Sequence, residues 1–503
     1  MADPRSSTVD DIVRRSARRW PDRVALLFAD RTWTYRELDD AVSRAAGLLL
    51  SRGLRRGDRV AAYGQNSDAY AIAFLGAARA GLVHVPINYA LTGDELSYLL
   101  EQSGATLVLA DPGLAPNLEK LAGAPEHLLL HGAPACVLEA VASGEVPTIE
   151  CDVADTELCQ LLYTSGTTSR AKGAMMTHRA FVHHYAATIM ALDLSADDQP
   201  LHAMPLYHSA GMHVFLLPYL AVGARNHLLP TPDISTVLAL IESERIGTMF
   251  LAPTVWVPLS QHPDFASRDL SSLRKAFYGA SIMPGPILTR LQEALPQLGF
   301  YNCFGQSEIG PLATVLRPEE HAARPDSCGR PILFVELRVV DDTGNDVEPG
   351  GTGEVIYRSP QLCLGYWEKP EETAAAFTDG WFHSGDLVRI DAEGYITVVD
   401  RIKDVINTGG VLVASREVED CVYTHPAVAE VAVIATPDPR WIEAVTAVVV
   451  LRPGATATEA EIIAHVKERL AKYKVPKRVE FLDELPRNAS GKLLKRVLRE
   501  LIP

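Results

Sequence analysis

The sequence predicts an α/β protein, with a large N-terminal part of parallel-rich sheets wrapped by helices and a small α+β part at the C-terminus. The first observation is the length of 503 residues, which exceeds what one hydrophobic core usually serves. The second is the alternation of strand-like and helical segments, which is typical of parallel sheets covered by helices. The third is a change after about residue 335, where short alternating strands broken by turns indicate a small β subdomain.

The N-terminal alternation can be followed segment by segment. Thr34-Tyr35-Arg36-Glu37 has capping-box spacing and predicts a helix that runs to Leu50. A further helix is expected from Gly93. The other predicted elements here are strands at 23–28, 59–63, 82–87 and 106–110 and a helix at 69–80. Residues 111–156 are rich in Ala, Pro and Gly, and we interpret them as connecting structure.

The alternation of strand-like and helical segments resumes from residue 159, and shorter strands follow toward the C-terminus. Apolar runs predict buried strands at 248–252 and 275–278. Shorter alternating strands follow at 335–340, 353–358 and 394–399. The last hundred residues read as one α/β unit, with strands at 428–436 and 444–451 and an amphipathic helix at 460–471 that stops before Pro476.

Composition excludes several classes of protein. The chain is 47% hydrophobic and 22% charged, which is typical of a globular protein and argues against disorder. A net charge of −16 argues against a nucleic-acid partner. The start of the chain lacks the apolar core of a signal peptide, and no apolar run is long enough for a transmembrane segment. The seven cysteines show no paired spacing, which suits reduced thiols. We therefore expect a cytoplasmic protein, and peripheral membrane contact stays open.

One stretch, Tyr163 to Gly173, interleaves hydroxyl side chains with glycines and follows a short apolar run. Such a loop can bring backbone N–H groups and hydroxyls together around a phosphate. It is not a P-loop, because no Gly-Lys-Ser/Thr closes it. Taken alone, the stretch fits a plain surface loop equally well.

The same stretch resembles the hallmark loop of the adenylate-forming superfamily, which contains acyl-CoA synthetases, aryl-CoA ligases, luciferases and adenylation domains. The resemblance is greatest to a bacterial fatty-acyl-CoA synthetase and runs from about Asp10 to Arg499. Ser169 and Ala171 stand where glycine and proline are usual. The resemblance implies that ATP or AMP is bound by Thr164, Ser165, Gly166, Thr167, Thr168 and Lys172.

A second stretch, Tyr301 to Glu308, resembles the Tyr-Gly-x-Thr-Glu motif of the superfamily. The resemblance implies that Phe304 stacks on adenine, that Ser307 holds the α-phosphate and that Glu308 binds Mg²⁺. These roles suit a π-face, a small hydroxyl donor and a hard oxygen ligand. Gly305 and a preceding turn complete this part of the implied nucleotide site, and the residues of that turn are Gly279, Ala280 and Ser281.

Two further motifs follow in the order that the superfamily has them. Trp381 to Asp386 resembles the ribose-binding motif, with Asp386 as the ribose ligand, and Asp400 to Asp404 resembles the hinge motif. Arg401 would also contact ribose, and Lys403 would be the hinge of a mobile C-terminal domain. The resemblance therefore implies an N-terminal domain of residues 1–401 and a C-terminal domain of residues 402–503.

The C-terminal domain carries the two remaining sites that the resemblance implies. Gly409 and Gly410 open the segment that lines the pantetheine tunnel, and Val411-Leu412 replace residues that are usually polar. Pro486 to Lys492 resembles the motif that ends in the adenylation lysine. Lys492 would bridge the incoming carboxylate and the α-phosphate, whose mutual repulsion must be offset during attack.

The acid substrate is indicated by Pro205 to Gly211, which resembles the stretch that carries an aromatic residue and a histidine beside the substrate carboxylate. His208 stands where amino-acid-activating domains usually have an aspartate, which argues against an amino acid. The nearby apolar or aromatic side chains favour an acyl or aryl tail, although for Met212 and Trp256 an ordinary core position is the stronger reading. The predicted acyl pocket is His208, Met212, Trp256 and Tyr278. The spacing of the histidines between 178 and 213 does not match a zinc site.

These observations predict an ATP-dependent acyl-CoA synthetase that converts a small-molecule carboxylic acid to acyl-AMP and then to the CoA thioester. Its cofactors would be ATP, Mg²⁺ and coenzyme A, with Lys492, Glu308 and His208 as catalytic residues. A medium- or long-chain fatty acid is the favoured substrate. The alternatives are an aryl-CoA ligase of the coumarate or benzoate kind and a non-catalytic family member with an impaired thioester step. We expect a monomer or a homodimer.

Overall fold

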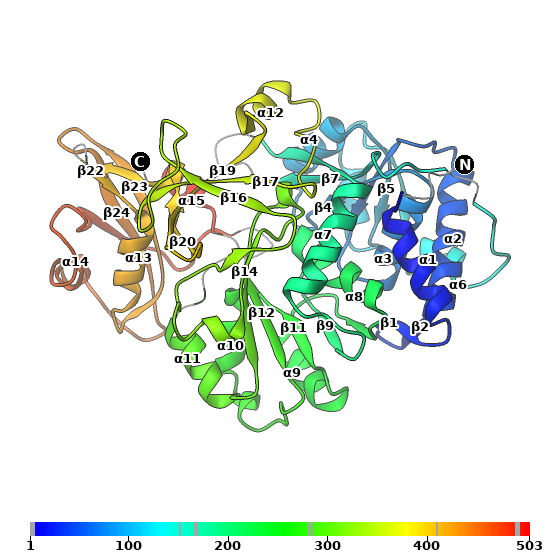
Figure 1. The fold of residues 1–503 in the computed structure, drawn as a ribbon, viewed down its shortest axis with the longest axis horizontal. Helices are drawn as coiled ribbons and strands as arrows, with labels where there is room; N and C mark the ends of the chain where they lie inside the picture. The colour runs from blue at the N-terminus through cyan, green and yellow to red at the C-terminus, as the bar shows by residue number, and fades with distance from the viewer. Residues whose placement is uncertain are drawn as a thin grey trace. The chain divides into compact units, whose positions relative to one another are not determined.

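The computed structural model describes residues 6–149, 152–164, 170–279, 283, 285–408, 411–487 and 493–502. The chain divides into two compact units (Figure 1). Unit 1 contains most of the chain up to Glu336, together with Arg358–Phe382. Unit 2 contains Leu337–Tyr357 and the chain from His383 onward. The predicted α/β class, with parallel-rich sheets, is confirmed. The predicted domain boundary after Arg401 stays a prediction.

One sheet of unit 1 has six strands in the order β6-β5-β3-β4-β7-β8. Neighbouring strands are parallel except for the β7–β8 hairpin, which is antiparallel. The inner strands β3, β4, β5 and β7 are mostly apolar, as is typical of a parallel sheet covered by helices. The strand bounds are β3 Arg59–Tyr63, β4 Val83–Ile87, β5 Ala105–Ala110, β6 Glu126–Leu129, β7 Leu158–Thr164 and β8 Lys172–Thr177.

The second sheet of unit 1 has nine strands in the order β15-β14-β13-β12-β11-β9-β10-β1-β2. Its centre is parallel, and β2, β14 and β15 are antiparallel to their neighbours. The bounds are β1 Val24–Phe28, β2 Arg31–Thr34, β9 Pro200–His202, β10 Asn226–Leu228, β11 Thr248–Phe250, β12 Lys275–Gly279, β13 Gly299–Phe304, β14 Thr314–Leu316 and β15 Arg330–Pro331.

Helices of unit 1 pack around these sheets, and α3 is buried along its whole length. A π-helical turn, η1 at Ala210–Leu216, leads directly into α8 and was not predicted. The helices are α1 Val9–Arg19, α2 Tyr35–Ser51, α3 Asp68–Arg79, α4 Gly93–Ser103, α5 Ala115–Glu119, α6 Val137–Ala142, α7 His178–Ala191, α8 Leu217–Val222, α9 Ile234–Ser243, α10 Pro253–Gln261, α11 Gly285–Ala294 and α12 Pro370–Ala376.

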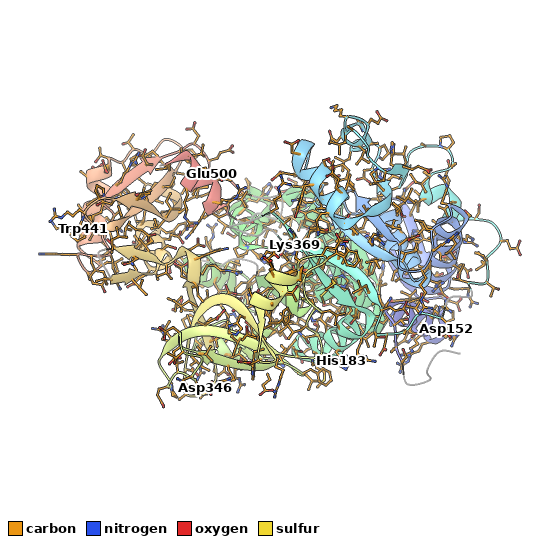
Figure 2. The ribbon with its side chains drawn as sticks, turned by 90° about the horizontal axis from the view of Figure 1, so that it is seen from above. Asp152, His183, Asp346, Lys369, Trp441 and Glu500 are labelled. Carbon is orange, nitrogen blue, oxygen red and sulfur yellow. The ribbon has the colours of Figure 1, made fainter. Side chains whose placement is uncertain are left out.

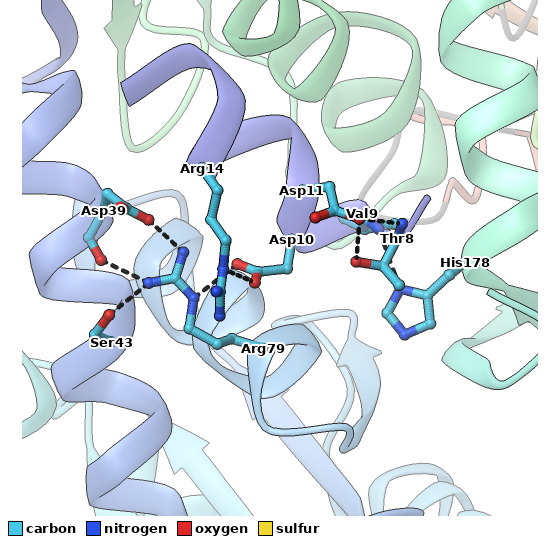
Figure 3. Close-up of polar contacts among 9 residues, drawn as sticks. All are labelled: Thr8, Val9, Asp10, Asp11, Arg14, Asp39, Ser43, Arg79 and His178. Carbon is cyan, nitrogen blue, oxygen red and sulfur yellow. Dashed lines mark hydrogen bonds and ion pairs between the residues drawn. The ribbon is translucent and has the colours of Figure 1, made fainter. Parts of the chain in front are cut away.

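Helix α1 is held on α2 and α3 by a buried charge network (Figure 3). The guanidinium of Arg79 donates to Asp10 Oδ1 at 2.8 Å, to Ser43 Oγ at 2.6 Å and to the side chain of Asp39. The Arg79 side chain is only 1% exposed, so its charge is stable only because these acceptors surround it. At the start of the helix, the Val9 N–H donates to Nδ1 of His178 at 3.2 Å.

Unit 2 contains most of the predicted β subdomain, whose sheet includes β16 Glu336–Val340, β17 Thr352–Arg358, β19 Trp381–Ile390 and β20 Ile396–Arg401. Glu336, Arg358 and the first two residues of β19 belong to unit 1. The short strand β18 at Phe377–Thr378 pairs with the start of β19 and belongs to unit 1.

A five-stranded C-terminal sheet in unit 2 has the order β22-β21-β24-β23, with β25 paired to β24. Trp441 lies at the β23–β24 turn (Figure 2). The elements are β21 Ile406–Thr408, β22 Val411–Val413, β23 Val428–Asp438, β24 Ile442–Leu451, β25 Arg478–Phe481, α13 Ser415–Tyr423, α14 Glu459–Lys467 and α15 Lys495–Leu501.

Two sequence predictions differ from the structure. The region 111–156 contains β6, which extends the six-stranded sheet by pairing in parallel with β5. The Ala, Pro and Gly content of the region led to its interpretation as connecting structure, which hid this edge strand. The helix expected at 460–471 ends at Lys467, and Leu470 continues only as a turn, in which its N–H donates to Val466 O. In the part of the chain that the structure describes, no helix has the length and apolar character needed to cross a bilayer.

Candidate active site

The β7–β8 hairpin carries the glycine- and hydroxyl-rich loop. Thr164 and Lys172 are direct partners in its antiparallel register, so both predicted nucleotide ligands lie at its tip. The hairpin is anchored on α4, where Tyr98 donates to Ala171 O at 3.0 Å and its ring lies 4.9 Å from the guanidinium carbon of Arg170. Ser165, Gly166, Thr167 and Thr168, all predicted ligands, lie outside the described residues.

In the nine-stranded sheet, the adjacent strands β12 and β13 end in two further predicted nucleotide ligands, Gly279 and Phe304. They are parallel, with Gly279 paired to Cys303, so their carboxyl ends lie at the same edge of the sheet, the usual place for ligands in such folds. Gly305 follows with a φ of 155°, and a Cβ there would lie 2.0 Å from the carbonyl oxygen of Pro311. Only glycine fits this turn. The predicted Ala280 and Ser281 lie outside the described residues.

A 3₁₀ turn, η3 at Ser307–Ile309, places the predicted metal ligand Glu308. Its carboxylate is 7% exposed and accepts a hydrogen bond from Tyr366 Oη at 3.0 Å. The ring of the same tyrosine lies 5.0 Å from Nζ of Lys172. Tyr366 therefore contacts both Glu308, the predicted metal ligand, and Lys172, a predicted nucleotide ligand.

The loop that carries His208 reaches the same turn. Ser209, which is 2% exposed, has its Oγ 2.9 Å from Oγ of Ser307. His208 is half-buried, and its Nδ1 accepts from the Ala210 N–H at 3.3 Å. Burial raises the pKa of the adjacent Tyr207 hydroxyl, so the phenol stays protonated. The structure therefore brings together residues from three predicted motifs: Lys172 from the hairpin, Ser209 from the stretch 205–211, and Ser307 and Glu308 from the stretch 301–308.

Three of the four residues predicted to line an acyl tail, Met212, Trp256 and Tyr278, are buried in unit 1. Met212 and Trp256 are each 0% exposed, and the indole N–H of Trp256 donates to Phe277 O at 3.2 Å. Tyr278 is 2% exposed, and its Oη lies 3.0 Å from Nε2 of His321. The polar side-chain atoms of Trp256 and Tyr278 thus already have protein partners. Their assignment to an acyl pocket stays a prediction.

Unit 2 carries the predicted ribose residues. Asp386 on β19 is opposite Arg401 on β20, and their Oδ1 and Nε atoms are 2.6 Å apart. Asp386 is only 3% exposed, so the guanidinium compensates a buried carboxylate. The predicted hinge, Lys403, lies in a 3₁₀ turn at Ile402–Asp404. The predicted Gly409, Gly410 and Lys492 lie outside the described residues.

The donor set at η3 fits Mg²⁺ bound with a nucleotide. Within the described ranges no three His, Cys, Asp or Glu side chains form a metal-binding group. A magnesium ion that arrives with phosphates needs only one or two carboxylates, and Glu308 offers such a carboxylate. The buried His213 is instead part of a hydrogen-bond chain, with Tyr185 Oη at 2.6 Å and Gln160 Oε1 at 2.8 Å.

Sequence reasoning missed two residues of this arrangement, Ser209 and Tyr366. Ser209 lies inside a motif that was considered for its aromatic residue and its histidine. Tyr366 lies in Gly365-Tyr366-Trp367, where an aromatic pair after a glycine was the available signal. Nothing local in the sequence shows that this tyrosine, 58 residues from Glu308, contacts it.

The fold and the site define a two-unit α/β enzyme whose hairpin loop, buried carboxylate and histidine suit a phosphate-bearing substrate. Family comparison specifies the class. The model described as "AMP-binding enzyme" matches residues 13–367, and "AMP-binding enzyme C-terminal domain" matches residues 417–492. The chain belongs to the AMP-binding enzyme family, and the resemblance inferred from the motifs is confirmed.

Individual relatives agree with this assignment. The chain is 39% identical to a feruloyl-CoA synthase from Amycolatopsis, over 96% of this chain and 97% of the relative. It is 34% identical to the long-chain-fatty-acid–CoA ligase FadD13 from Mycobacterium tuberculosis, over 94% and 93%. The ATP-bound crystal structure of MatB from Rhodopseudomonas palustris superposes with a TM-score of 0.90 at 31% identity, covering 98% of this chain and 99% of MatB. The protein is an AMP-forming acid–thiol ligase, a class that uses ATP, Mg²⁺ and CoA.

Proposed function

We propose that the protein activates an aryl-bearing carboxylic acid as its acyl-AMP and transfers the acyl group to CoA. The observation that carries the choice of substrate class is the 39% identity to a feruloyl-CoA synthase over nearly the whole of both chains. A medium- or long-chain fatty acid is the second candidate, supported by the similarity to FadD13.

The residues are proposed to act as follows. In the first step a carboxylate oxygen of the acid attacks the α-phosphorus of ATP, and the bond to pyrophosphate breaks. His208 orients the carboxylate, and the Ser307 hydroxyl donates to an α-phosphate oxygen. Lys172 and Lys492 offset the negative charge that accumulates as the two anions meet. Glu308 holds Mg²⁺, which when bound screens the phosphate charges.

Unit 2 contributes to both steps in this proposal. Asp386 accepts hydrogen bonds from the ribose hydroxyls, and Arg401 holds that carboxylate in place. In the second step the CoA sulfur attacks the acyl carbon, and the C–O bond to AMP breaks. Gly409 and Gly410 allow the pantetheine arm to pass close to the backbone. The C-terminal domain of residues 402–503 turns about Lys403 between the steps.

Pyrophosphate release with ATP and Mg²⁺ tests this function against ferulate, coumarate, benzoate and fatty acids of several lengths, each with and without CoA. We expect release to require an aryl acid and the thioester to require CoA. A higher kcat/KM for fatty acids than for aryl acids would favour the second candidate, a medium- or long-chain fatty acid. Pyrophosphate without thioester would place this chain among members with an impaired second step. If no acid supports pyrophosphate release, the proposed function is contradicted.

A lysine substitution separates the half-reactions. Lys492→Ala is expected to abolish acyl-AMP formation while leaving thioester formation from preformed acyl-AMP largely intact. Lys467→Ala, at an exposed lysine on α14 of unit 2, is the matched control and should retain both activities. Equal loss of both half-reactions in Lys492→Ala would refute the role given to Lys492.

A further inference from the structure

The segment Gln361–Trp367, here called the connecting segment, lies along the edge of β8. Its backbone extends the sheet, because Leu364 N–H donates to Met175 O at 3.0 Å and Met175 N–H donates to Gly365 O at 2.9 Å. An antiparallel bridge pairs Tyr366 with Ala174. The Trp367 N–H donates to Gly173 O at 2.8 Å. The connecting segment is therefore fixed to the strand that begins with Lys172.

The same segment is also fixed to the turn that carries Glu308. The Cys363 N–H donates to Glu308 O at 2.8 Å. The side chain of Gln361, which is 0% exposed, donates from Nε2 to Ile309 O at 2.8 Å and to Leu312 O at 2.7 Å. Three hydrogen bonds thus hold the backbone around η3. The connecting segment joins the hairpin and the metal-ligand turn as one hydrogen-bonded body within unit 1.

The side chain of Tyr366 completes the connection, and its own position is constrained. Thr373 Oγ1 accepts from the Tyr366 N–H at 2.9 Å and donates to Lys369 O at 2.8 Å (Lys369 is labelled in Figure 2). The preceding Gly365 has a φ of 130°, and a Cβ there would lie 2.4 Å from the methyl carbon of Thr373. The tyrosine is 8% exposed. Its backbone and its ring have little freedom to move.

The two contacts of the side chain act on two different groups. The phenol donates to Oε1 of Glu308 at 3.0 Å, which fixes the carboxylate plane and leaves Oε2 free of this bond. The ring lies 5.0 Å from Nζ of Lys172, within the range in which a π-face attracts an ammonium group. Partners that orient a metal ligand commonly matter nearly as much as the ligand itself.

We propose that Tyr366 is a positioning residue that orients the Glu308 carboxylate for the metal–nucleotide complex and holds Lys172 beside it. The inference rests on the proposed function in taking Glu308 as the metal ligand. It assigns a role to a residue outside the motifs that the sequence singled out. It also gives the two contacts different roles: the hydroxyl orients the Glu308 carboxylate, and the ring holds the ammonium group of Lys172.

The test compares Tyr366→Phe, which removes only the hydroxyl, with Tyr366→Leu, which removes the ring as well. The readouts are Mn²⁺ binding in the presence of ATP, followed by electron paramagnetic resonance, and the Mg²⁺ dependence of pyrophosphate release. For Tyr366→Phe we expect the half-saturating metal concentration to rise about tenfold or more. The KM for ATP at saturating metal should stay within about twofold of wild type. Tyr366→Leu should add a rise of about fivefold in that KM.

Tyr219→Phe is the matched control, because Tyr219 is also buried in unit 1 and donates to a carboxylate, Asp198 Oδ2, at 3.2 Å. It should leave the metal dependence unchanged. An equal shift in both Phe variants, or no shift in Tyr366→Phe, would overturn the proposal. If Tyr366→Phe does not fold, Thr373→Val removes the acceptor of the Tyr366 N–H and should give a smaller shift of the same sign. No shift there would overturn it.

The binding readout keeps this inference apart from the proposed function. Mn²⁺ and ATP bind without an acid substrate, so an enzyme that binds them but releases no pyrophosphate would contradict only the proposed function. The Tyr366 variants would still be decided by the metal-binding curve. A wild-type protein that binds no Mn²⁺ with ATP would overturn both.

Discussion

The contact between Ser209 and Ser307 offers a direct test of how the acid and nucleotide motifs are coupled. It joins the His208 loop to the metal-ligand turn across a separation of 98 residues, with the two oxygens 2.9 Å apart. The perturbation is a double-mutant cycle of Ser209→Ala, Ser307→Ala and the double variant. Ser209 is 2% exposed, so alanine removes a hydroxyl without exposing new surface.

The magnitude follows from the geometry. A buried hydrogen bond between neutral groups contributes about 1 kcal/mol net, which corresponds to about fivefold in kcat/KM if the bond is intact in the transition state. Ser307→Ala should cost more than this, because the same hydroxyl is proposed to donate to the α-phosphate. Once Ser307 is alanine, the further substitution of Ser209 should cost little.

The assay is acid-dependent pyrophosphate release, with kcat/KM measured separately for the acid and for ATP. We expect a coupling energy of about 1 kcal/mol, visible with both substrates. Thermal unfolding of the four proteins controls for a general loss of stability. Additive effects, within about 0.3 kcal/mol, would refute the reasoning that this hydroxyl pair transmits between the two motifs.

Four further outcomes are expected. Arg79→Met should lower the free energy of unfolding by about 1.5–3 kcal/mol in urea titrations, because Asp10 loses a charged hydrogen-bond partner and keeps only its ion pair with Arg14; a loss below about 1 kcal/mol would contradict this. Asp386→Asn should raise the KM for ATP about tenfold, since a charge-assisted acceptor is lost, and an unchanged KM would argue against ribose binding. Burial lowers the pKa of His84 from 6.5 to about 3, so the folded protein holds this imidazole neutral. Because the unfolded chain binds a proton there below pH 6.5, the free energy of unfolding keeps its full value above pH 6.5 and falls by about 2 kcal/mol at pH 5. His84→Gln should flatten that slope, measured by urea midpoints at several pH values. Leu412→Asn, at a side chain 69% exposed, should leave acyl-AMP formation within about twofold and change only the thioester step, and an equal change in both would contradict its assignment to the CoA side.

Local signals explain most of what the sequence could predict about the fold. The capping box at Thr34 forms as its spacing indicates, with the Glu37 N–H donating to Thr34 Oγ1 at 3.2 Å and the Thr34 N–H donating to Glu37 Oε2 at 2.8 Å. The strands at 59–63 and 353–358 are found within a residue of the expected bounds. The edge strand β6 was missed because its pairing with β5 is a non-local property that its own composition does not reveal.

The candidate site shows the same division between local and non-local information. The identity of the motifs was predictable because each needs particular side-chain types at fixed spacing, as at Glu308 and Asp386. Their mutual contacts were not, because they depend on register. Thr164 faces Lys172 only through the β7–β8 pairing. Met212 was named from its neighbourhood in sequence, whereas its 0% exposure depends on how η1 packs in the core.

The arrangement in unit 1 has a physical logic that the separate motifs do not reveal. A site that brings two anions together must hold its cations and its carboxylate in fixed positions before the substrates arrive, since reorganisation during reaction would consume the stabilisation. Each motif alone lies on a loop or a strand end, where single residues have considerable freedom. The Ser209–Ser307 pair and the Glu308–Tyr366 bond remove that freedom by joining loops from distant parts of the chain. The rigidity of the site therefore comes from these hydrogen bonds between loops rather than from any single motif.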